Sequence, residues 1–288
     1  MRLLVISPAK NEADFLPGLI DSMKGQTRTP DQWVIVDDQS TDRTGAIAQD
    51  AAGTTPWMTV VSAPERTQRD FSAKVRSFNA GLRSVDWRSF DLIGNIDSDL
   101  TLEPGVLELL VDQFQKDETL GVAGVPFVEN GQSYDFQFSN INHVSGAVQI
   151  FRRECYQAIG GYQPVKIGGI DWIAVARARL EGWRTRTFTE SKVIHHRPMG
   201  TALSSKQRYF YRLGTQDYFF GGSARWQALR GIYQMSKKPR ILGGGFLLAG
   251  FFRHWLQWRA RIVDRELAVF HKREQLQRLR SFLLRGRS

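Results

Sequence analysis

The chain has 288 residues, of which 42% are hydrophobic, 11% aromatic and 24% charged, so it can bury the core of one large domain. This composition excludes a disordered chain and a fibrous repeat, and the single cysteine, Cys155, excludes an intramolecular disulfide framework and a multi-cysteine zinc site. The formal net charge is +10, but residues 201–288 hold 18 Lys and Arg against 4 Asp and Glu, whereas residues 1–200 hold 21 against 25.

The uneven charge predicts two parts with different surfaces. These are an acidic body over residues 1–202 and a basic, aromatic, helical extension over residues 203–288. No stretch reaches the ~20 apolar residues of a membrane-spanning helix. The N-terminal apolar run meets Lys10 and Glu12 almost at once and is too short for a signal peptide. We therefore expect a protein of the cytoplasm.

The first half of the chain alternates apolar runs with amphipathic segments. Runs rich in Val, Ile and Leu predict buried strands, and the segments between them carry apolar residues at helical spacing. Repeated strand–helix–strand units favour an α/β fold with a mostly parallel sheet and helices on both faces. The strands are predicted at Leu3–Ile6, Trp33–Val36, Met58–Val61, Leu92–Ile96 and Gly121–Val125, and the helices at Glu12–Met23, Asp42–Ala51, Ala73–Val85 and Pro104–Gln115.

Shorter elements are expected beyond residue 140. The pattern predicts a strand over Ser145–Phe151, a short helix over Arg153–Ile159 and a helix that opens after Gly168–Gly169 and runs to Glu181. Two further short strands are predicted at Thr185–Phe188 and Lys192–His196.

Polar residues follow three of the predicted strands at their carboxyl ends. The first strand runs into residues 7–12, the second into residues 37–42, and the strand Leu92–Ile96 into Asp97–Asp99. Because parallel sheets bind ligands outside the carboxyl ends of their strands, we expect these side chains to gather at one edge. Asp and Asn are also common in loops and caps, which is the alternative for any single strand.

Asp97 and Asp99 are the residues most suited to chemistry. Two carboxylates one residue apart can ligate a hard divalent cation or accept hydrogen bonds from a ribose. A cation held there would offset the charge of a diphosphate leaving group. The sequence contains neither the glycine fingerprint of a dinucleotide dehydrogenase nor a P-loop, which counts against both classes of enzyme. Lys74, Arg76 and Asn79 could meet a phosphate or form a solvated helix face, and the residues alone leave both readings open.

Four motifs in order resemble the family 2 glycosyltransferases, which have the GT-A fold. They are Ser-Pro-Ala-Lys-Asn-Glu (7–12), Val-Asp-Asp-Gln-Ser-Thr-Asp (36–42), Lys-Val-Arg-Ser-Phe-Asn-Ala-Gly (74–81) and Ile-Asp-Ser-Asp (96–99), within a resemblance over about residues 3–200. The resemblance implies an inverting, hexosyl-type transfer from a nucleotide-diphosphate sugar to a hydroxyl of a sugar, lipid-linked or other acceptor. It also implies Mg²⁺ or Mn²⁺ and a role in cell-envelope or extracellular polysaccharide or glycolipid synthesis.

The resemblance also assigns roles to individual residues. Asp38 would bind the base or ribose, Asp97 would face the ribose or sugar, and Asp99 would coordinate the metal. His195 would be a further metal ligand, although His196 beside it leaves that choice open. The implied nucleotide-sugar pocket comprises Pro8, Asn11, Glu12, Asp37, Asp38, Ser40, Lys74, Arg76, Asn79 and Asp97.

Asp171 stands where the family places its general base. The family has two acidic residues before a helix, and here Ile170 replaces the first of them. An inverting transfer needs one carboxylate facing the acceptor hydroxyl, whereas a residue that opens a helix can also be its N-cap. The family's processive motif, Gln-x-x-Arg-Trp, is absent apart from an echo at Arg225–Trp226, so we expect one sugar added per encounter.

The basic extension holds an apolar run over residues 241–252, flanked by Arg240, Arg253 and Trp255. The run is too short to span a bilayer, and it suits a helix in the head-group zone of an anionic leaflet. It therefore predicts a protein peripheral to the inner face of the membrane. Alternatively, the aromatic residues pack on the catalytic domain. A long basic helix is expected over Arg259–Arg287, and nucleic-acid binding is not expected, because no recognition motif is present.

Two other functions fit these residues. A nucleotidyltransferase can share an acidic α/β site, and a membrane-associated protein that has lost its base could bind a nucleotide-sugar without turnover. The products distinguish the three functions. Glycosyl transfer releases a nucleoside diphosphate, nucleotidyl transfer releases diphosphate, and a binding protein releases neither.

Overall fold

The structure of the chain is a computed structural model that describes residues 1–64, 73–129, 140–165, 167–197, 206–237 and 239–285. The chain divides into two compact units. The first comprises Met1–Lys166 with Ile170–Pro198, and the second comprises Ile167–Gly169 with Met199–Ser288. The boundary expected between residues 202 and 203 lies outside the described residues.

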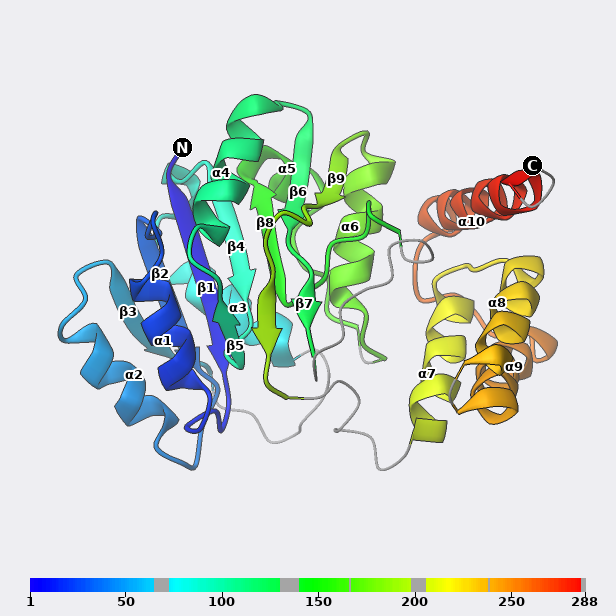
Figure 1. The fold of residues 1–288 in the computed structure, drawn as a ribbon, viewed down its shortest axis with the longest axis horizontal. Coiled ribbons are helices and arrows are strands. Elements are labelled where there is room, and N and C mark those ends of the chain that lie inside the picture. Colours follow the sequence, from blue (N-terminus) through cyan, green and yellow to red (C-terminus); the bar gives the residue numbers. More distant parts are fainter. Residues whose placement is uncertain (65–72, 130–139, 166, 198–205, 238, 286–288) are drawn as a thin grey trace. The chain divides into compact units, whose positions relative to one another are not determined.

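A seven-stranded sheet forms the centre of the first unit (Figure 1). In spatial order its strands are β3 (Met58–Ser62), β2 (Gln32–Asp37), β1 (Leu3–Ala9), β4 (Leu92–Ile96), β8 (Val148–Arg152), β6 (Leu120–Gly124) and β9 (Arg184–Thr187). All neighbouring strands are parallel except β8, which runs antiparallel to both β4 and β6. The mostly parallel sheet predicted from the sequence is therefore confirmed.

Helices cover both faces of this sheet, which explains why its central strands are apolar on both sides (Figure 1). Side chains of β1 alternate between the two faces: Leu3 and Val5 join the core under α1 and α4, whereas Ile6 faces α3. A Cβ at Gly81 of α3 would lie 2.8 Å from Ile6 and from Val36, so this glycine lets the helix approach the sheet closely. The helices of the unit are α1 (Leu16–Lys24), α2 (Thr44–Ala52), α3 (Ala73–Arg83), the 3₁₀ turn Trp87–Ser89, α4 (Val106–Lys116), α5 (Arg153–Ala158) and α6 (Ile170–Leu180).

A second, three-stranded sheet lies beside the carboxyl end of β4. Its order is β5 (Leu100–Leu102), β10 (Val193–His195) and β7 (Phe127–Val128). β5 begins directly after Asp99, and its pairing with β10 sets His195 opposite Leu100. This small sheet therefore fixes the end of the Asp97–Asp99 loop against a strand almost a hundred residues away.

Helices α1, α2 and α4 of the first unit begin two to four residues later than the sequence predicts, and a residue with positive φ precedes both α1 and α4. Asn11 has a positive φ of 54°, and α1 starts at Leu16 instead of Glu12. Gly105 has a φ of 84° and precedes α4, so Pro104 lies before that helix and the expectation that it occupies the first helical turn is wrong. Left-handed residues interrupt a helix at its start, and apolar spacing does not reveal them.

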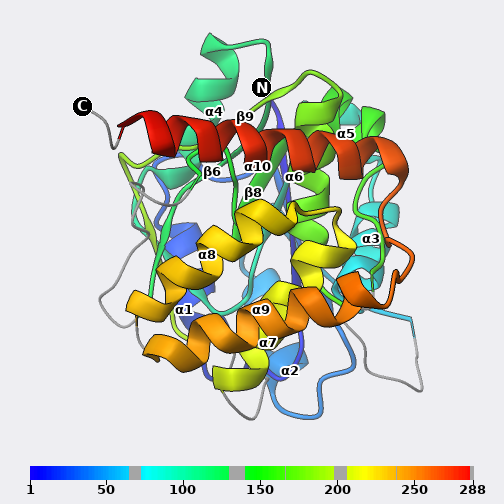
Figure 2. The same cartoon turned by 90° about the vertical axis from the view of Figure 1, so that its right-hand side faces the viewer.

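The second unit is helical, with α7 (Lys206–Phe219), α8 (Ala224–Ser236), α9 (Arg240–Leu256) and α10 (Arg265–Arg285). Figure 2 shows α8 and α9 side by side and α10 as one long helix. Glycines permit the close packing of α9 against its neighbours. A side chain at Gly214 or Gly250 would clash between α7 and α9, and a side chain at Gly231 or Gly244 would clash between α8 and α9. The long basic helix α10 starts at Arg265, six positions after the predicted Arg259, because a turn lies between α9 and α10.

Across the part of the chain that the structure describes, no helix combines the length and apolar content needed to cross a bilayer.

Candidate active site

The loops that follow β1, β2 and β4 are tied together by hydrogen bonds. The backbone N–H of Asn11 donates to Ser40 Oγ at 3.0 Å, and Asn11 Oδ1 accepts from the N–H of Thr41 at 2.8 Å. The hydroxyl of Ser98 donates to the carbonyl of Pro8 at 3.1 Å. Three segments far apart in the sequence therefore meet at one edge of the sheet, as the parallel topology predicts.

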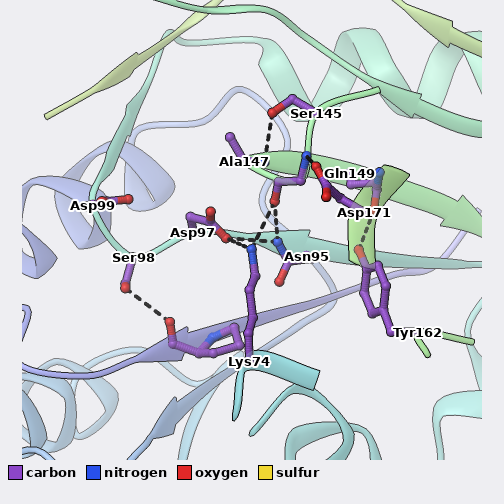
Figure 3. A network of polar contacts seen from close by, with 12 residues as sticks. Lys74, Asn95, Asp97, Ser98, Asp99, Ser145, Ala147, Gln149, Tyr162 and Asp171 are labelled. Atoms are coloured by element: carbon purple, nitrogen blue, oxygen red, sulfur yellow. Dashed lines mark hydrogen bonds and ion pairs between the residues drawn. The ribbon is translucent and has the colours of Figure 1, made fainter. Parts of the chain in front are cut away.

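Asp97 is the centre of a polar network at this edge (Figure 3). Lys74 reaches from α3 to form an ion pair with Asp97 Oδ1, and Asn95 Nδ2 donates to the same oxygen at 3.0 Å. Burial raises the pKa of Asp97, although the neighbouring ammonium of Lys74 acts in the opposite direction. The carboxylate of Asp97 is thus held in one orientation by two donors.

Gly146 connects this network to Asp171. Its carbonyl accepts hydrogen bonds from Asn95 Nδ2 at 2.6 Å and from Lys74 Nζ at 3.3 Å, while its N–H donates to Asp171 Oδ2 at 3.2 Å. A Cβ at Gly146 would lie 2.8 Å from the Cβ of Asp171. Asp171 is the second residue of α6, and its half-buried carboxylate lies beside the loop before β8. The backbone of one glycine therefore joins the Asp97 network to the residue expected to act as base.

Asp99 lies against His195. Asp99 is 9% exposed, and its Oδ2 lies 3.4 Å from His195 Nε2. Burial alone would raise the pKa of Asp99, but hydrogen bonding and charge from His195, together with Arg197, outweigh it and hold the pKa below its usual value. His196 is exposed and its Nε2 pairs with Thr101 Oγ1 at 2.7 Å, so the structure brings His195 and not His196 to this carboxylate.

The donor atoms around His195 fit a divalent cation. A carboxylate oxygen and an imidazole nitrogen both suit Mn²⁺-like ions, and a metal-bound histidine commonly donates its other N–H to a carboxylate. His195 Nδ1 lies 3.7 Å from Glu129 Oε2, which is beyond hydrogen-bond distance, so Glu129 lies near this nitrogen without accepting its proton. Within the described ranges no group of three or more His, Cys, Asp and Glu side chains could hold an ion alone. Asp99 and His195 therefore suit an ion that takes its other ligands from substrate phosphates and water, as Mg²⁺ commonly does.

Glu12 is buried in the loop after β1 and pairs with Arg197. Arg197 Nη2 lies 2.7 Å from Glu12 Oε2, across 185 positions of sequence. Burial raises the pKa of Glu12 from 4.5 to about 7, even though Arg197 lowers it; the charge of Asp99 adds to the rise. Glu12 thus changes its charge close to neutral pH.

This raised pKa predicts how stability depends on pH. Between pH 4.5 and about 7 the folded protein keeps the Glu12 proton that the unfolded chain releases, so this group's contribution to stability falls as the pH rises. We expect Glu12→Gln, which imitates the protonated acid, to remove that fall. Melting temperatures of both proteins measured from pH 5 to pH 8 will test this, and parallel curves would contradict the role given to Glu12.

The remaining residues predicted for the pocket lie at the end of β2 and on α3. Asp37 Oδ1 accepts a hydrogen bond from the N–H of Ser40 at 3.0 Å, and Asp38 is 7% exposed at the end of β2. Arg76 is exposed and Asn79 is half-buried on α3. Because helix residues two apart do not face each other, Arg76 does not share the direction in which Lys74 points. The roles given to these residues stay predictions.

Sequence patterns miss four side chains or backbone groups that shape the site. Asn95 is a fully buried amide in an otherwise apolar strand, and that unusual polar residue was the available signal. Gly146 acts through its backbone, so its side chain gives no signal. Glu129 reaches the site through β7, whose two residues are too few to predict from periodicity. Arg197 follows β10, a strand that the sequence does predict, but no local pattern indicates its contact with Glu12.

One family model matches the chain. It is described as Glycosyl transferase family 2, and it covers residues 4–172, a range that includes Glu12, the Asp97–Asp99 loop and Asp171.

Solved structures show where the same fold occurs. A mannosyltransferase of Pyrobaculum calidifontis, PcManGT, in complex with GDP-Man and Mn²⁺, matches with a TM-score of 0.59 and 20% identity over 93% of this chain and 78% of that chain. S. aureus TarS 1-349 in complex with UDP-GlcNAc matches with a TM-score of 0.58 and 16% identity over 89% of this chain and 73% of that one. At such identities the likeness concerns the fold alone.

Two curated proteins of Pasteurella multocida match part of the sequence. A chondroitin synthase (strain Pm70) and a hyaluronan synthase are each 33% identical to this chain over 113 residues. The matched stretch covers 39% of this chain and 11% of either synthase, so it corresponds to a small part of those proteins.

Proposed function

The chain belongs to glycosyl transferase family 2, and from this premise we propose that it is an inverting transferase that moves a sugar from a nucleotide-diphosphate sugar to an acceptor hydroxyl. The fold, a mostly parallel sheet flanked by helices, is shared with GT-A glycosyltransferases. Family membership supports glycosyl transfer over the nucleotidyl transfer that the acidic site also allows. The proposal adds the donor class, the divalent cation and the stereochemistry.

One observation supports the proposal most directly: the backbone of Gly146 links the Asp97 network to Asp171. A donor held at Asp97 would therefore lie within reach of a carboxylate on a different element. Inverting transfer requires that a base and a leaving group lie on opposite sides of the sugar carbon. Two solved neighbours are complexes with nucleotide-sugars, GDP-Man and UDP-GlcNAc, which supports a donor of this class.

Separate residues would bind the donor and remove the proton of the acceptor. Asp38 would accept hydrogen bonds from the base or ribose, with Pro8, Asn11, Asp37 and Ser40 lining the same loops. Asp97, oriented by Lys74, would hold the ribose or sugar. Asp171 would take the proton of the acceptor hydroxyl as the new bond to the sugar carbon forms and the bond to the diphosphate oxygen breaks.

Asp99 and His195 would hold Mg²⁺ or Mn²⁺. When bound there, the ion would offset the negative charge that develops on the departing diphosphate. Despite burial, the hydrogen bond and charge of His195 lower the pKa of Asp99. An ion bound between the two side chains would replace the proton that they share, so ion binding would release that proton.

The proposed acceptor and cellular role rest on the matched synthases and on the basic second unit. The matched Pasteurella synthases carry the names of polysaccharides, which supports polysaccharide or glycolipid synthesis for the cell envelope or exterior. The basic second unit supports a position at the inner, anionic face of the membrane with a sugar, lipid-linked or other hydroxyl acceptor.

Slow hydrolysis of the donor tests this function without a known acceptor. We expect one nucleotide-sugar from a panel to raise the melting temperature in the presence of Mn²⁺ and to release its nucleoside diphosphate. Release of diphosphate would instead indicate nucleotidyl transfer. A ligand that stabilises the protein but stays intact with every acceptor tried would indicate a binding protein without turnover.

A further inference from the structure

Helix α9 exposes an apolar face on the side opposite its packing contacts. Gly243, Gly244, Leu247, Gly250 and Phe251 are buried against α7 and α8. The outer side follows helical spacing through Leu242, Gly245, Ala249, Arg253 and Leu256. Leu242 is 57% exposed and Leu256 is 68% exposed, and a Cβ at Gly245 would meet nothing within 4 Å. Apart from Arg253, this outer row is uncharged along the whole helix.

The turn after α9 presents a tryptophan in a conformation that side chains rarely adopt. The N–H of Arg259 donates to the carbonyl of His254 and the N–H of Trp258 to that of Trp255, which together form a Schellman motif. Its left-handed position is usually Gly, but here it is Trp258, with a φ of 51° and 88% of its surface exposed. The fold therefore gains little from this side chain, which stacks only on the exposed ring of Trp255 among the described aromatic pairs.

Positive charge surrounds the exposed apolar residues. Between Asp217 and Asp264 the sequence holds eight Lys and Arg and no Asp or Glu. Exposed Arg253 contacts the hydroxyl of Tyr211 and exposed Arg259 contacts the amide of Gln257, both neutral oxygens. Both arginines also line a hollow of about 380 Å³ together with Phe219, His254, Gln257 and Ala260. Burial, together with these two arginines, lowers the pKa of His254, as expected where cations gather.

This combination favours an anionic partner with an apolar interior. Two copies of the chain that met face to face through this surface would bring like charges together, which opposes that dimer. Nucleic acid would match the charge but would leave exposed aliphatic residues such as Ile241, which is 73% exposed, in water. An anionic bilayer offers phosphates to the arginines and acyl chains to the aliphatic side chains, with the interface suited to tryptophan.

We propose that the outer face of α9 and the turn after it bind an anionic lipid bilayer. This α9 surface comprises Leu242, Ala249, Arg253, Leu256, Trp258 and Arg259. Trp258 and Leu256 enter the head-group zone, and Arg253 and Arg259 pair with lipid phosphates. This inference rests on the proposed function in one respect: that function includes a position at the membrane, and the inference names the residues that make the contact.

Cosedimentation of the full chain with vesicles tests the charged part of the surface. We expect binding to phosphatidylcholine–phosphatidylglycerol vesicles and little binding to pure phosphatidylcholine. Arg253→Gln/Arg259→Gln should weaken binding to the mixed vesicles by about 10- to 30-fold. Arg273→Gln/Arg280→Gln, which removes the same charge from exposed positions of α10, should change it by less than about threefold. Equal losses in both pairs would overturn the assignment, as would binding to single-stranded RNA in preference to the mixed vesicles.

Trp258→Gly separates membrane binding from folding. Glycine adopts the left-handed position without strain, so we expect a melting temperature equal to or above that of the parent protein. Vesicle binding should nevertheless fall by about tenfold. Unchanged binding would overturn the proposal. In the absence of vesicles, Trp258→Gly should hydrolyse the donor at the parent rate. If the parent protein itself hydrolysed no donor, that result would contradict the proposed function but not the membrane binding of the α9 surface.

Discussion

Asp99→Asn should lower Mn²⁺-dependent release of nucleoside diphosphate by about two to three orders of magnitude. Asp99 is buried beside His195, and the low pKa of its carboxylate supplies a full negative charge at neutral pH. Asparagine keeps the shape, and the backbone carbonyl at this position can still accept the hydrogen bond from the N–H of His196 at 3.1 Å. The substitution therefore removes the charge that would bind the ion while leaving the pairing of β5 and β10 in place.

Initial rates over a Mn²⁺ titration, together with calorimetric Mn²⁺ binding, will measure this effect. Asp117→Asn is a suitable control, because the pKa of Asp117 is also lowered, by hydrogen bonds that its carboxylate accepts from Thr119, but Asp117 lies between α4 and β6. We expect that control to keep the parent affinity for Mn²⁺. Full activity of Asp99→Asn after removal of metal by a chelator would rule out the role of Asp99.

The sheet could be predicted because each central strand carries its signal locally. Leu3–Ile6 and Trp33–Val36 are continuous apolar runs, as expected of strands buried on both faces, and each run is followed at once by polar residues. The rule that carboxyl ends of parallel strands share an edge then brings Asn11, Ser40 and Ser98 into one region before any coordinates are known.

The parts that could not be predicted depend on long-range or backbone interactions. β5 and β7 have three and two residues, too few for any periodicity to show. The contact between Glu12 and Arg197 joins positions 185 residues apart, and Gly146 contributes only an N–H and a carbonyl. Helices α7 and α9 meet through Gly214 and Gly250, and glycine lowers the apparent helix propensity that a sequence pattern measures.

Asp171→Asn should reduce the rate of sugar transfer by about two to four orders of magnitude while leaving donor binding almost unchanged. The amide cannot take a proton from the acceptor hydroxyl, yet its oxygen can still accept the hydrogen bond from Gly146 N–H that positions the parent carboxylate at 3.2 Å. Steady-state kinetics should therefore show a large fall in kcat and little change in the KM for the donor. Glu181→Gln, an exposed site just beyond α6, is the matched control and should keep the parent kcat.

Gly146→Ala tests the same role through position instead of charge. A methyl group at Gly146 would lie 2.8 Å from the Cβ of Asp171, so Asp171 must shift although its carboxylate is retained. A base acts only within hydrogen-bond reach of the proton that it removes, so we expect kcat to fall in this variant as well. Parent-like transfer by Asp171→Asn would show that another group accepts the proton. If Gly146→Ala lost activity while Asp171→Asn kept it, the function of Gly146 would be to hold Asp97 and Lys74, and the base would have to be sought elsewhere.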